Sequence, residues 1–145
     1  MPYDVVVGVD SSDASRRAVA LACQLQSRHL AGPMLLVHVV PWSPFSFNTP
    51  QENERRHKQH EAEIQAADDQ ILAPLRQIAQ EHGCQADTTV RHGDPVAVLE
   101  EIARKESARL LVVGRTGDTG IRERIFGGLP AHLVQAAPVP VVVVP

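Results

Sequence analysis

The segment Leu110-Leu111-Val112-Val113-Gly114 decides the fold class, because an uninterrupted apolar run ends directly on a glycine. A strand that is covered on both faces has no solvent side, so its apolar residues need not alternate with polar ones. Similar runs cover Tyr3 to Val9, Met34 to Val40 and Val141 to Val144. Together these runs predict the strands of a parallel sheet that has helices on both faces.

Helical patterns lie between these runs. Apolar residues recur with helical spacing from Ala18 to Leu25 and again from Ile64 to Ala79. Pro74 interrupts the second stripe, so we expect the helix to kink or a new helix to start there. Asp94-Pro95 is a strong helix start, since a capping carboxylate precedes a proline at the first helical position. A last short helix is expected over Pro130 to Ala136.

The order of these segments predicts the architecture. Ala86 to Arg91 is β-prone but half polar, which is typical of an edge strand. Strands and helices then alternate along the chain, and the layer rules make this an α/β, doubly wound, Rossmann-like sandwich. We see no internal repeat or linker, so residues 1–145 are expected to form one domain. Pro41 to Pro50 is the one irregular stretch, and it is a candidate flap near the carboxyl edge of the sheet.

Composition excludes two classes of partner. A net charge of −3 argues against an electrostatic grip on nucleic acid, and 3% aromatic residues leave few platforms for stacking bases. No apolar stretch approaches the roughly 20 residues of a membrane span. The N-terminal residues carry no export signal, so a cytoplasmic protein is expected. Cys23 and Cys84 lack metal-type spacing, and we expect each to be a small buried apolar residue rather than half of a disulfide.

Ligands of open parallel sheets bind at the carboxyl ends of the strands. Three segments are delivered to that edge, namely Asp10-Ser11-Ser12, Val40-Pro41-Trp42 and Gly114-Arg115-Thr116-Gly117. Glycines there let the backbone approach a ligand without a Cβ in the way. Gly127-Gly128 opens the final helix, whose free N–H groups and dipole favour an anion. The pattern therefore predicts a site for a ligand that carries phosphate.

The spacing of these glycines carries a resemblance to a known family. Gly114, Gly117 and Gly127 form the pattern G-x-x-G-x9-G between two valine-rich strands. With Val5 to Ser12 at the start and Ala137 to Val144 at the end, the whole chain resembles the universal stress proteins. The resemblance implies a five-stranded sheet of order 3-2-1-4-5. It also implies a homodimer, formed in many members by pairing of the last strands, here Val141 to Val144.

One branch of that family binds ATP through the glycine pattern and another branch does not. The resemblance implies ATP as the ligand, with Mg²⁺ accompanying it. Asp10 and the backbone around Val39 would contact the adenine end, and the glycines would line the ribose and phosphates. The full set of expected nucleotide-binding residues is Asp10, Ser11, Val39, Gly114, Arg115, Thr116, Gly117, Gly127, Gly128 and Leu129.

One position departs from the ATP-binding pattern, which has Ser or Thr directly after the last glycine. Here that residue is Gly128, so a hydroxyl donor worth about 1 kcal/mol is lost while the backbone N–H stays. AMP or cyclic AMP is therefore an alternative ligand, because the polyphosphate end is weakened most. A second alternative is a nucleotide-free regulatory dimer that acts through protein contacts. Slow ATP hydrolysis is the most we expect as enzyme activity, since no general base is evident.

Other constellations are weaker. The chain contains no P-loop and no dinucleotide-binding fingerprint. His57, His60 and Glu61, with Glu54, have metal-ligand spacing, but they lie in an almost wholly polar run, which favours a solvated helix face. His38 stands in an apolar strand and is expected to be a hydrogen-bonded interior residue. The sequence therefore predicts a stress-response or regulatory protein that binds an adenine nucleotide, and it assigns no catalytic residue.

Overall fold

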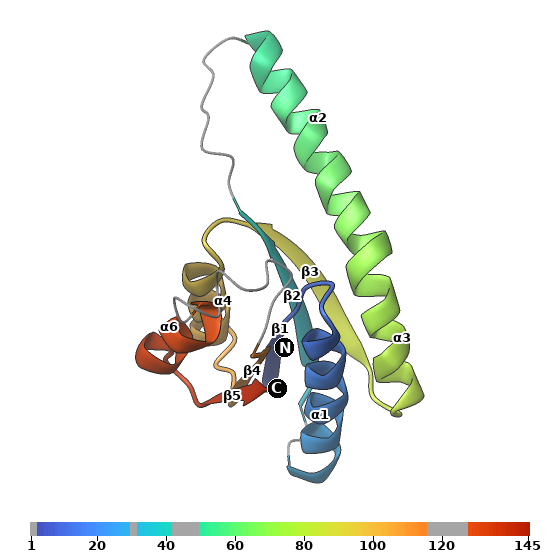
Figure 1. Ribbon diagram of the computed structural model, residues 1–145, viewed down its shortest axis with the longest axis vertical. Helices are drawn as coiled ribbons and strands as arrows, with labels where there is room; N and C mark the ends of the chain where they lie inside the picture. Colours follow the sequence, from blue (N-terminus) through green and yellow to red (C-terminus); the bar gives the residue numbers. More distant parts are fainter. Residues whose placement is uncertain (1–2, 30–31, 42–49, 116–127) are drawn as a thin grey trace.

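A computed structural model describes residues 3–29, 32–41, 50–115 and 128–145 (Figure 1). Its centre is a five-stranded sheet in which every pairing is parallel and the strand order is β3-β2-β1-β4-β5. The strands are β1 (Val5–Gly8), β2 (Met34–Val40), β3 (Ala86–His92), β4 (Leu110–Gly114) and β5 (Val141–Val144). The expected order 3-2-1-4-5 and the Rossmann-like fold class are confirmed, and the half-polar β3 is indeed an edge strand.

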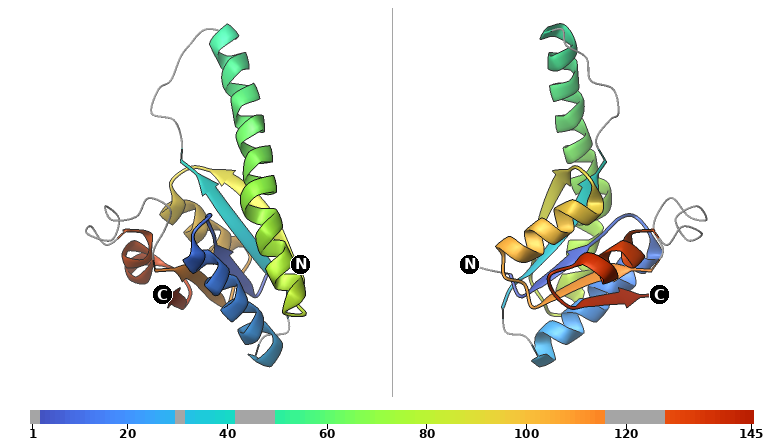
Figure 2. Two further views of the ribbon diagram at one scale, coloured as in Figure 1. Left: turned by 45° about the vertical axis from the view of Figure 1, so that its right-hand side comes forward. Right: turned by 90° about the vertical axis from the view of Figure 1, so that its left-hand side faces the viewer.

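Helices cover both faces of the sheet (Figure 2). The helices α1 (Asp13–His29) and α3 (Ala73–Glu81) pack on one face, and α4 (Pro95–Lys105) and α6 (Gly128–Ala136) pack on the other. Successive strand residues serve the two layers in turn: Val5 and Val7 join the first apolar core, and Val6 joins the second. This double burial explains why the central strands are apolar without alternation. None of the described helices is long and apolar enough to cross a membrane.

The long helix α2 (Pro50–Ala67) projects beyond the sheet before it continues into the π-helix η1 (Asp68–Leu72) and then α3 (Figure 1). Pro74 lies in the first turn of α3, which confirms the expected new helix. Pro74 has no N–H to donate to the preceding turn, and the wider π-turn accommodates its ring. The N–H of Ala73 accordingly donates to the carbonyl of Asp68, five residues back.

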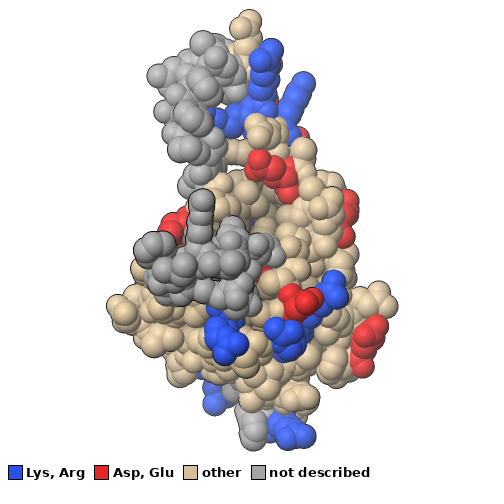
Figure 3. All heavy atoms as spheres, viewed as in Figure 1, with Lys and Arg blue, Asp and Glu red and all other residues tan. Residues whose placement is uncertain are grey.

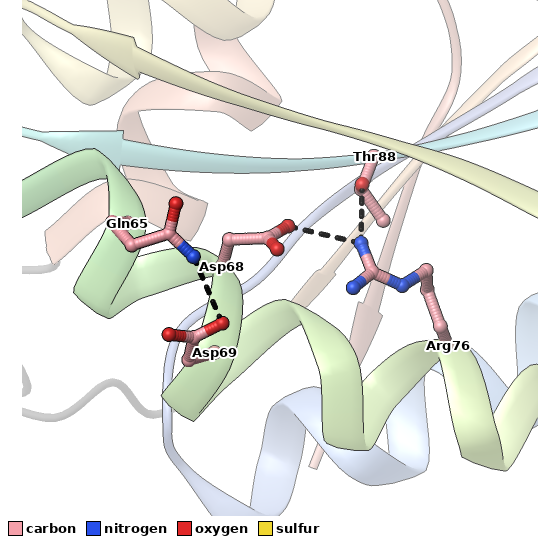
Figure 4. A network of polar contacts seen from close by, with 5 residues as sticks. All are labelled: Gln65, Asp68, Asp69, Arg76 and Thr88. Atoms are coloured by element: carbon pink, nitrogen blue, oxygen red, sulfur yellow. Dashed lines mark hydrogen bonds and ion pairs between the residues drawn. The ribbon is translucent and has the colours of Figure 1, made fainter. Parts of the chain in front are cut away.

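A polar network fastens this junction to β3 (Figure 4). Arg76 of α3 donates from Nη1 to Asp68 Oδ1 at 3.0 Å and to Thr88 Oγ1 at 2.8 Å. Gln65 Nε2 donates to Asp69 Oδ1 at 3.0 Å, one turn apart along the helix. Arg76 therefore connects the π-turn, α3 and the edge strand through one guanidinium nitrogen.

The two cysteines correct an expectation. Cys23 of α1 and Cys84, which lies just before β3, form a disulfide, with their Cα atoms 5.9 Å apart. Both residues are buried in the first core, at 1% and 9% exposure, so the expected burial is confirmed while the expected absence of a pair is wrong. The topology is the reason: packing of α1 beside α3 brings together two residues that are 61 positions apart in sequence.

Candidate functional site

The register of the central strands aligns the predicted site residues at one edge. Gly8, the last residue of β1, pairs with Val37 of β2 and Val113 of β4. The residues that follow these positions in the three strands are therefore neighbours at the carboxyl edge. They include Asp10, Val39 and Gly114, which the sequence analysis assigned to a nucleotide site.

Asp10 is held in place by the first turn of α1. Its Oδ1 atom accepts hydrogen bonds from the N–H of Ser12 at 2.9 Å and from Ser15 Oγ at 2.9 Å. The backbone N–H of Asp10 in turn donates to Ser15 Oγ at 2.8 Å, and Ser15 is 3% exposed. Ser12 Oγ accepts from the N–H of Ser15 at 3.2 Å, which is the hydrogen bond of a helix N-cap. A carboxylate with fixed orientation therefore stands at the edge, with the exposed Ser11 next to it.

Gly114 owes its missing side chain to packing. A Cβ on Gly114 would lie 2.7 Å from the Cβ of Ala14 and 3.2 Å from the carbonyl carbon of Ala14. Ala14 is in the first turn of α1 and 1% exposed, so it has no room to withdraw. From sequence, this glycine is explained by the approach of a ligand, whereas the structure supplies a different reason, the close contact of α1 with β4. The next residue, Arg115, is exposed and its N–H donates to the carbonyl of Val144 at 2.6 Å.

The β2 side of the edge is formed by backbone and a histidine. Val39 is half-buried and packs against the second apolar core. His38 Nδ1 lies 2.8 Å from the carbonyl oxygen of Val9, which confirms the expected hydrogen-bonded histidine. The carbonyl of Val40 accepts from the N–H of Gly93 at 3.0 Å, so the end of β2 is joined to the turn after β3.

The α6 side of the site is described in part. Gly128 begins α6 with a φ of 43°, a left-handed conformation that side-chain-bearing residues adopt at a cost. Leu129 is half-buried against the second core. The described residues do not include Thr116, Gly117 and Gly127. They also do not include residues 42–49, which make up most of the expected flap.

Comparison with known proteins identifies the family. The sequence model of the universal stress protein family matches residues 2–145. The chain belongs to this family. A universal stress protein of Methanocaldococcus jannaschii is 30% identical over 142 residues, which cover 97% of this chain and 80% of that protein. A relative from Mycolicibacterium smegmatis is 31% identical, and the chain spans 48% of its length.

Solved universal stress proteins share the fold of this family member. The protein UspA from Lactobacillus plantarum superimposes with a TM-score of 0.78 at 26% identity, covering 100% of this chain and 99% of that one. A universal stress protein solved in complex with cAMP gives a TM-score of 0.64 at 26% identity, with coverage of 100% and 98%. One from Archaeoglobus fulgidus, solved in complex with dAMP, gives 0.66 at 21% identity, with coverage of 99% and 98%, and shows likeness of fold.

In this universal stress protein a second cluster lies where α2 passes the end of β3. His92 Nε2 is 3.2 Å from Glu63 Oε2, and the imidazole rings of His60 and His92 stack with centroids 4.5 Å apart. The ligand atoms of His60, Glu63 and His92 all lie within 4.8 Å of one another.

The sequence pattern points to only one member of this cluster, His60. The solvated helix face it predicted is right for His57 and Glu61, which pair at 3.0 Å with side chains 76% and 68% exposed. It is wrong for His60, which is half-buried against β3. The His60-x-x-Glu63 spacing, which puts both side chains on one helix face, was the available signal. The contribution of His92 depends on how α2 and β3 pack.

Among the described residues, two clearly shifted pKa values lie away from the carboxyl edge. The pKa of Tyr3, just before β1, is raised to about 12, mainly because its hydroxyl donates to Asp87 Oδ2 at 2.7 Å and also because of burial. The pKa of Glu101 on α4 is lowered by its hydrogen bond with Lys105, 2.9 Å away. Both shifts belong to local pairs and assign no proton-transfer role at the candidate site.

Proposed function

We propose that residues 1–145 form one domain that binds an adenine nucleotide at the carboxyl edge, between the ends of β1 and β4. The observation that carries the proposal is that Asp10, Val39 and Gly114 lie at the carboxyl ends of three neighbouring strands, with Ala14 of α1 packed against Gly114. Ligands of open α/β sheets bind at this edge. The solved universal stress protein in complex with cAMP, at 26% identity over the whole chain, gives the proposal further support.

The residues present fit such a ligand in chemical type. Asp10 is a pre-oriented acceptor suited to a ribose hydroxyl or the adenine amino group, because the bonds from α1 fix its carboxylate. Backbone groups around Val39 would complete recognition of the base. Gly128 and Leu129 at the start of α6 offer backbone N–H groups to a phosphate. Ser11, Arg115, Thr116, Gly117 and Gly127 complete the proposed set.

The glycine pattern makes ATP, with Mg²⁺, the first nucleotide to test. AMP and cyclic AMP are the second candidates, and Gly128 favours them because it brings no hydroxyl to the polyphosphate end. Because Gly128 has a φ of 43°, a serine that restored the hydroxyl at this position would have to adopt a left-handed backbone conformation. A serine in that conformation costs on the order of 1 kcal/mol of fold stability with or without nucleotide, whereas the hydrogen bond to phosphate, worth about 1 kcal/mol, forms only in the complex. Gly128→Ser should therefore strengthen ATP binding roughly fivefold, while it lowers the free energy of unfolding by about 1 kcal/mol.

We further propose a cytoplasmic, regulatory homodimer that pairs through β5. This strand is bonded to β4 on one side only among the described residues. Pro140 and Val144 both direct their carbonyls to β4, so in a parallel ladder the N–H groups of Val141 and Val143 point to the other side. An antiparallel two-fold pairing with a second copy would satisfy them. The alternative of a dimer that acts without nucleotide shares this interface.

Calorimetric titration tests the nucleotide proposal. The unmodified chain should give saturable heat with at least one of ATP with Mg²⁺, AMP and cyclic AMP. Asp10→Asn should weaken that binding, because it removes the negative charge while it keeps the oxygen that accepts from α1. Asp4→Asn is the matched control: Asp4 also accepts a backbone hydrogen bond, from Gly32 at 2.9 Å, but it precedes β1 at the opposite edge.

Two results would contradict the nucleotide proposal. One is the absence of saturable heat with every nucleotide at millimolar concentration, which would favour the nucleotide-free dimer. The other is an equal loss of affinity in the Asp4 and Asp10 variants, which would move the site away from the carboxyl edge.

A further inference from the structure

The cluster of His60, Glu63 and His92 combines three potential metal ligands from two elements. His60 and Glu63 lie three residues apart on one face of α2, and His92 is the last residue of β3. The His92 side chain is 9% exposed and that of Glu63 is 37% exposed. We propose that these three side chains bind one divalent transition-metal ion of the Zn²⁺ class.

The distances are close to those of a coordinated ion. Bonds of about 2.0–2.1 Å to tetrahedral zinc place neighbouring ligand atoms roughly 3.4 Å apart. The 3.2 Å between His92 Nε2 and Glu63 Oε2 already matches that separation. The largest separation within the cluster is no more than 4.8 Å, so closure needs a movement on the order of 1 Å. Rotation of the His60 ring out of its stack on His92 would supply this movement, and the half-exposed Glu63 is able to follow.

The donor set selects the class of metal. Two imidazoles and one carboxylate suit Zn²⁺ and its transition-metal neighbours, whereas Mg²⁺ and Ca²⁺ prefer oxygen donors throughout. Three protein ligands also leave a fourth position open to water or another small ligand. The proposed ion is thus chemically distinct from a Mg²⁺ ion that accompanies ATP phosphates. The proposed metal site does not depend on nucleotide binding.

An ion bound by this cluster would hold α2 against β3. The end of α2 before the cluster projects from the sheet, and Lys and Arg side chains gather near its far end (Figure 3). Most described side chains of α2 are exposed, so few apolar contacts hold this helix. An ion shared by Glu63 and His92 would cross-link α2 to β3 at the point where the helix leaves the sheet. Gly93, the next residue, bonds to Val40, so the cross-link adjoins the end of β2.

The test uses the tag-free full chain, freed of metal with a chelator and titrated with ZnCl₂ by calorimetry without nucleotide. We expect one saturable site. Glu63→Gln and His92→Gln should each weaken Zn²⁺ binding by at least about tenfold, because loss of even an outer-sphere partner costs that much. His57→Gln is the matched control, since His57 lies on the same helix and pairs with a carboxylate but is 76% exposed. Its Zn²⁺ affinity should equal that of the unmodified chain.

Cobalt provides a second measurement. Co²⁺ bound by His60, Glu63 and His92 should give the intense visible bands of four-coordinate cobalt, and Glu63→Gln should need at least about ten times more Co²⁺ to reach half of their full intensity. Circular dichroism should show that Glu63→Gln is folded, because Glu63 is partly exposed and belongs to neither apolar core. The proposal is overturned if no saturable Zn²⁺ site is found, or if His57→Gln lowers affinity as much as His92→Gln. It is equally overturned if Glu63→Gln gives the same cobalt bands as the unmodified chain at the same Co²⁺ concentrations.

Discussion

Replacement of Gly114 by alanine should destabilise the fold, because the new methyl group has nowhere to go. The added Cβ would lie 2.7 Å from Ala14 Cβ and 3.4 Å from the carbonyl oxygen of Ala14. The first of these distances is well inside van der Waals contact, and neither partner is the end of a flexible side chain. Either α1 or the end of β4 must shift, although both belong to the packed centre of the sheet.

The expected size follows from overpacking. Extra methyl groups in a well-packed interior cost about 1–3 kcal/mol, so Gly114→Ala should lower the free energy of unfolding by roughly 2 kcal/mol. Ala14→Gly alone should cost roughly 1 kcal/mol through lost helix propensity. In the double variant the new methyl group occupies the space that the old one vacated. The two costs should therefore fail to add, with an interaction of about 1–2 kcal/mol in favour of folding.

Urea unfolding of the unmodified chain and the three variants measures these values. Gly8→Ala is a comparison at a second tightly packed position and should also be destabilising, because its added Cβ would meet Leu99 Cδ1 at 2.9 Å and Val113 Cγ1 at 3.2 Å, and both residues are buried. A Gly114→Ala variant as stable as the unmodified chain, or a double variant whose loss equals the simple sum, would refute the packing explanation. Nucleotide affinity in the double variant then separates the roles of Gly114: recovery indicates packing, and continued loss indicates direct ligand contact.

Three further predictions concern other parts of the molecule. Tyr3 is the chain's one tyrosine, so its absorbance should titrate with a pKa of about 12, and Asp87→Asn should bring it back toward 10.0. Because the folded-state value is raised, the stabilisation is complete below pH 10.0 and should disappear as pH rises through about 12. Reduction of the Cys23–Cys84 disulfide, whose residues are 61 positions apart, should lower the free energy of unfolding by about 4 kcal/mol, and urea curves unchanged by reductant would contradict this. Val143→Pro should yield a folded monomer by light scattering, since it removes an N–H directed away from β4, and a dimer of unchanged mass would reject the β5 interface.

The features predictable from sequence are those that local pattern controls. Strands such as Leu110–Gly114 are apolar throughout because both faces are buried, and this run is visible without a structure. Asp94 is confirmed as a helix cap, accepting from the N–H of Ala97 at 3.0 Å, because the cap and its partner are three residues apart. Pro74 likewise acts on its own turn.

The features that escaped prediction depend on contacts between distant segments. The Cys23–Cys84 disulfide depends on the packing of α1 beside α3. The contact of His92 with α2 requires the helix to pass the end of β3. Sequence and structure agree that Asp10 lies at the carboxyl edge of the sheet, since the end of a strand is a local feature. The close approach of Ala14 to Gly114 depends on how α1 lies across β4. This arrangement cannot be read from the spacing of residues in the sequence.

Amide chemical-shift mapping tests the central proposal most directly. When AMP or ATP with Mg²⁺ is added to the ¹⁵N-labelled chain, the amides of Asp10, Val39, Gly114 and Arg115 should shift together and saturate at a common ligand concentration. The amides of Gly32 and Gly83, which precede β2 and β3 at the opposite edge, should stay in place. Unchanged spectra at millimolar nucleotide, or shifts confined to the edge that holds Gly32 and Gly83, would contradict a nucleotide site at the carboxyl ends of β1 and β4.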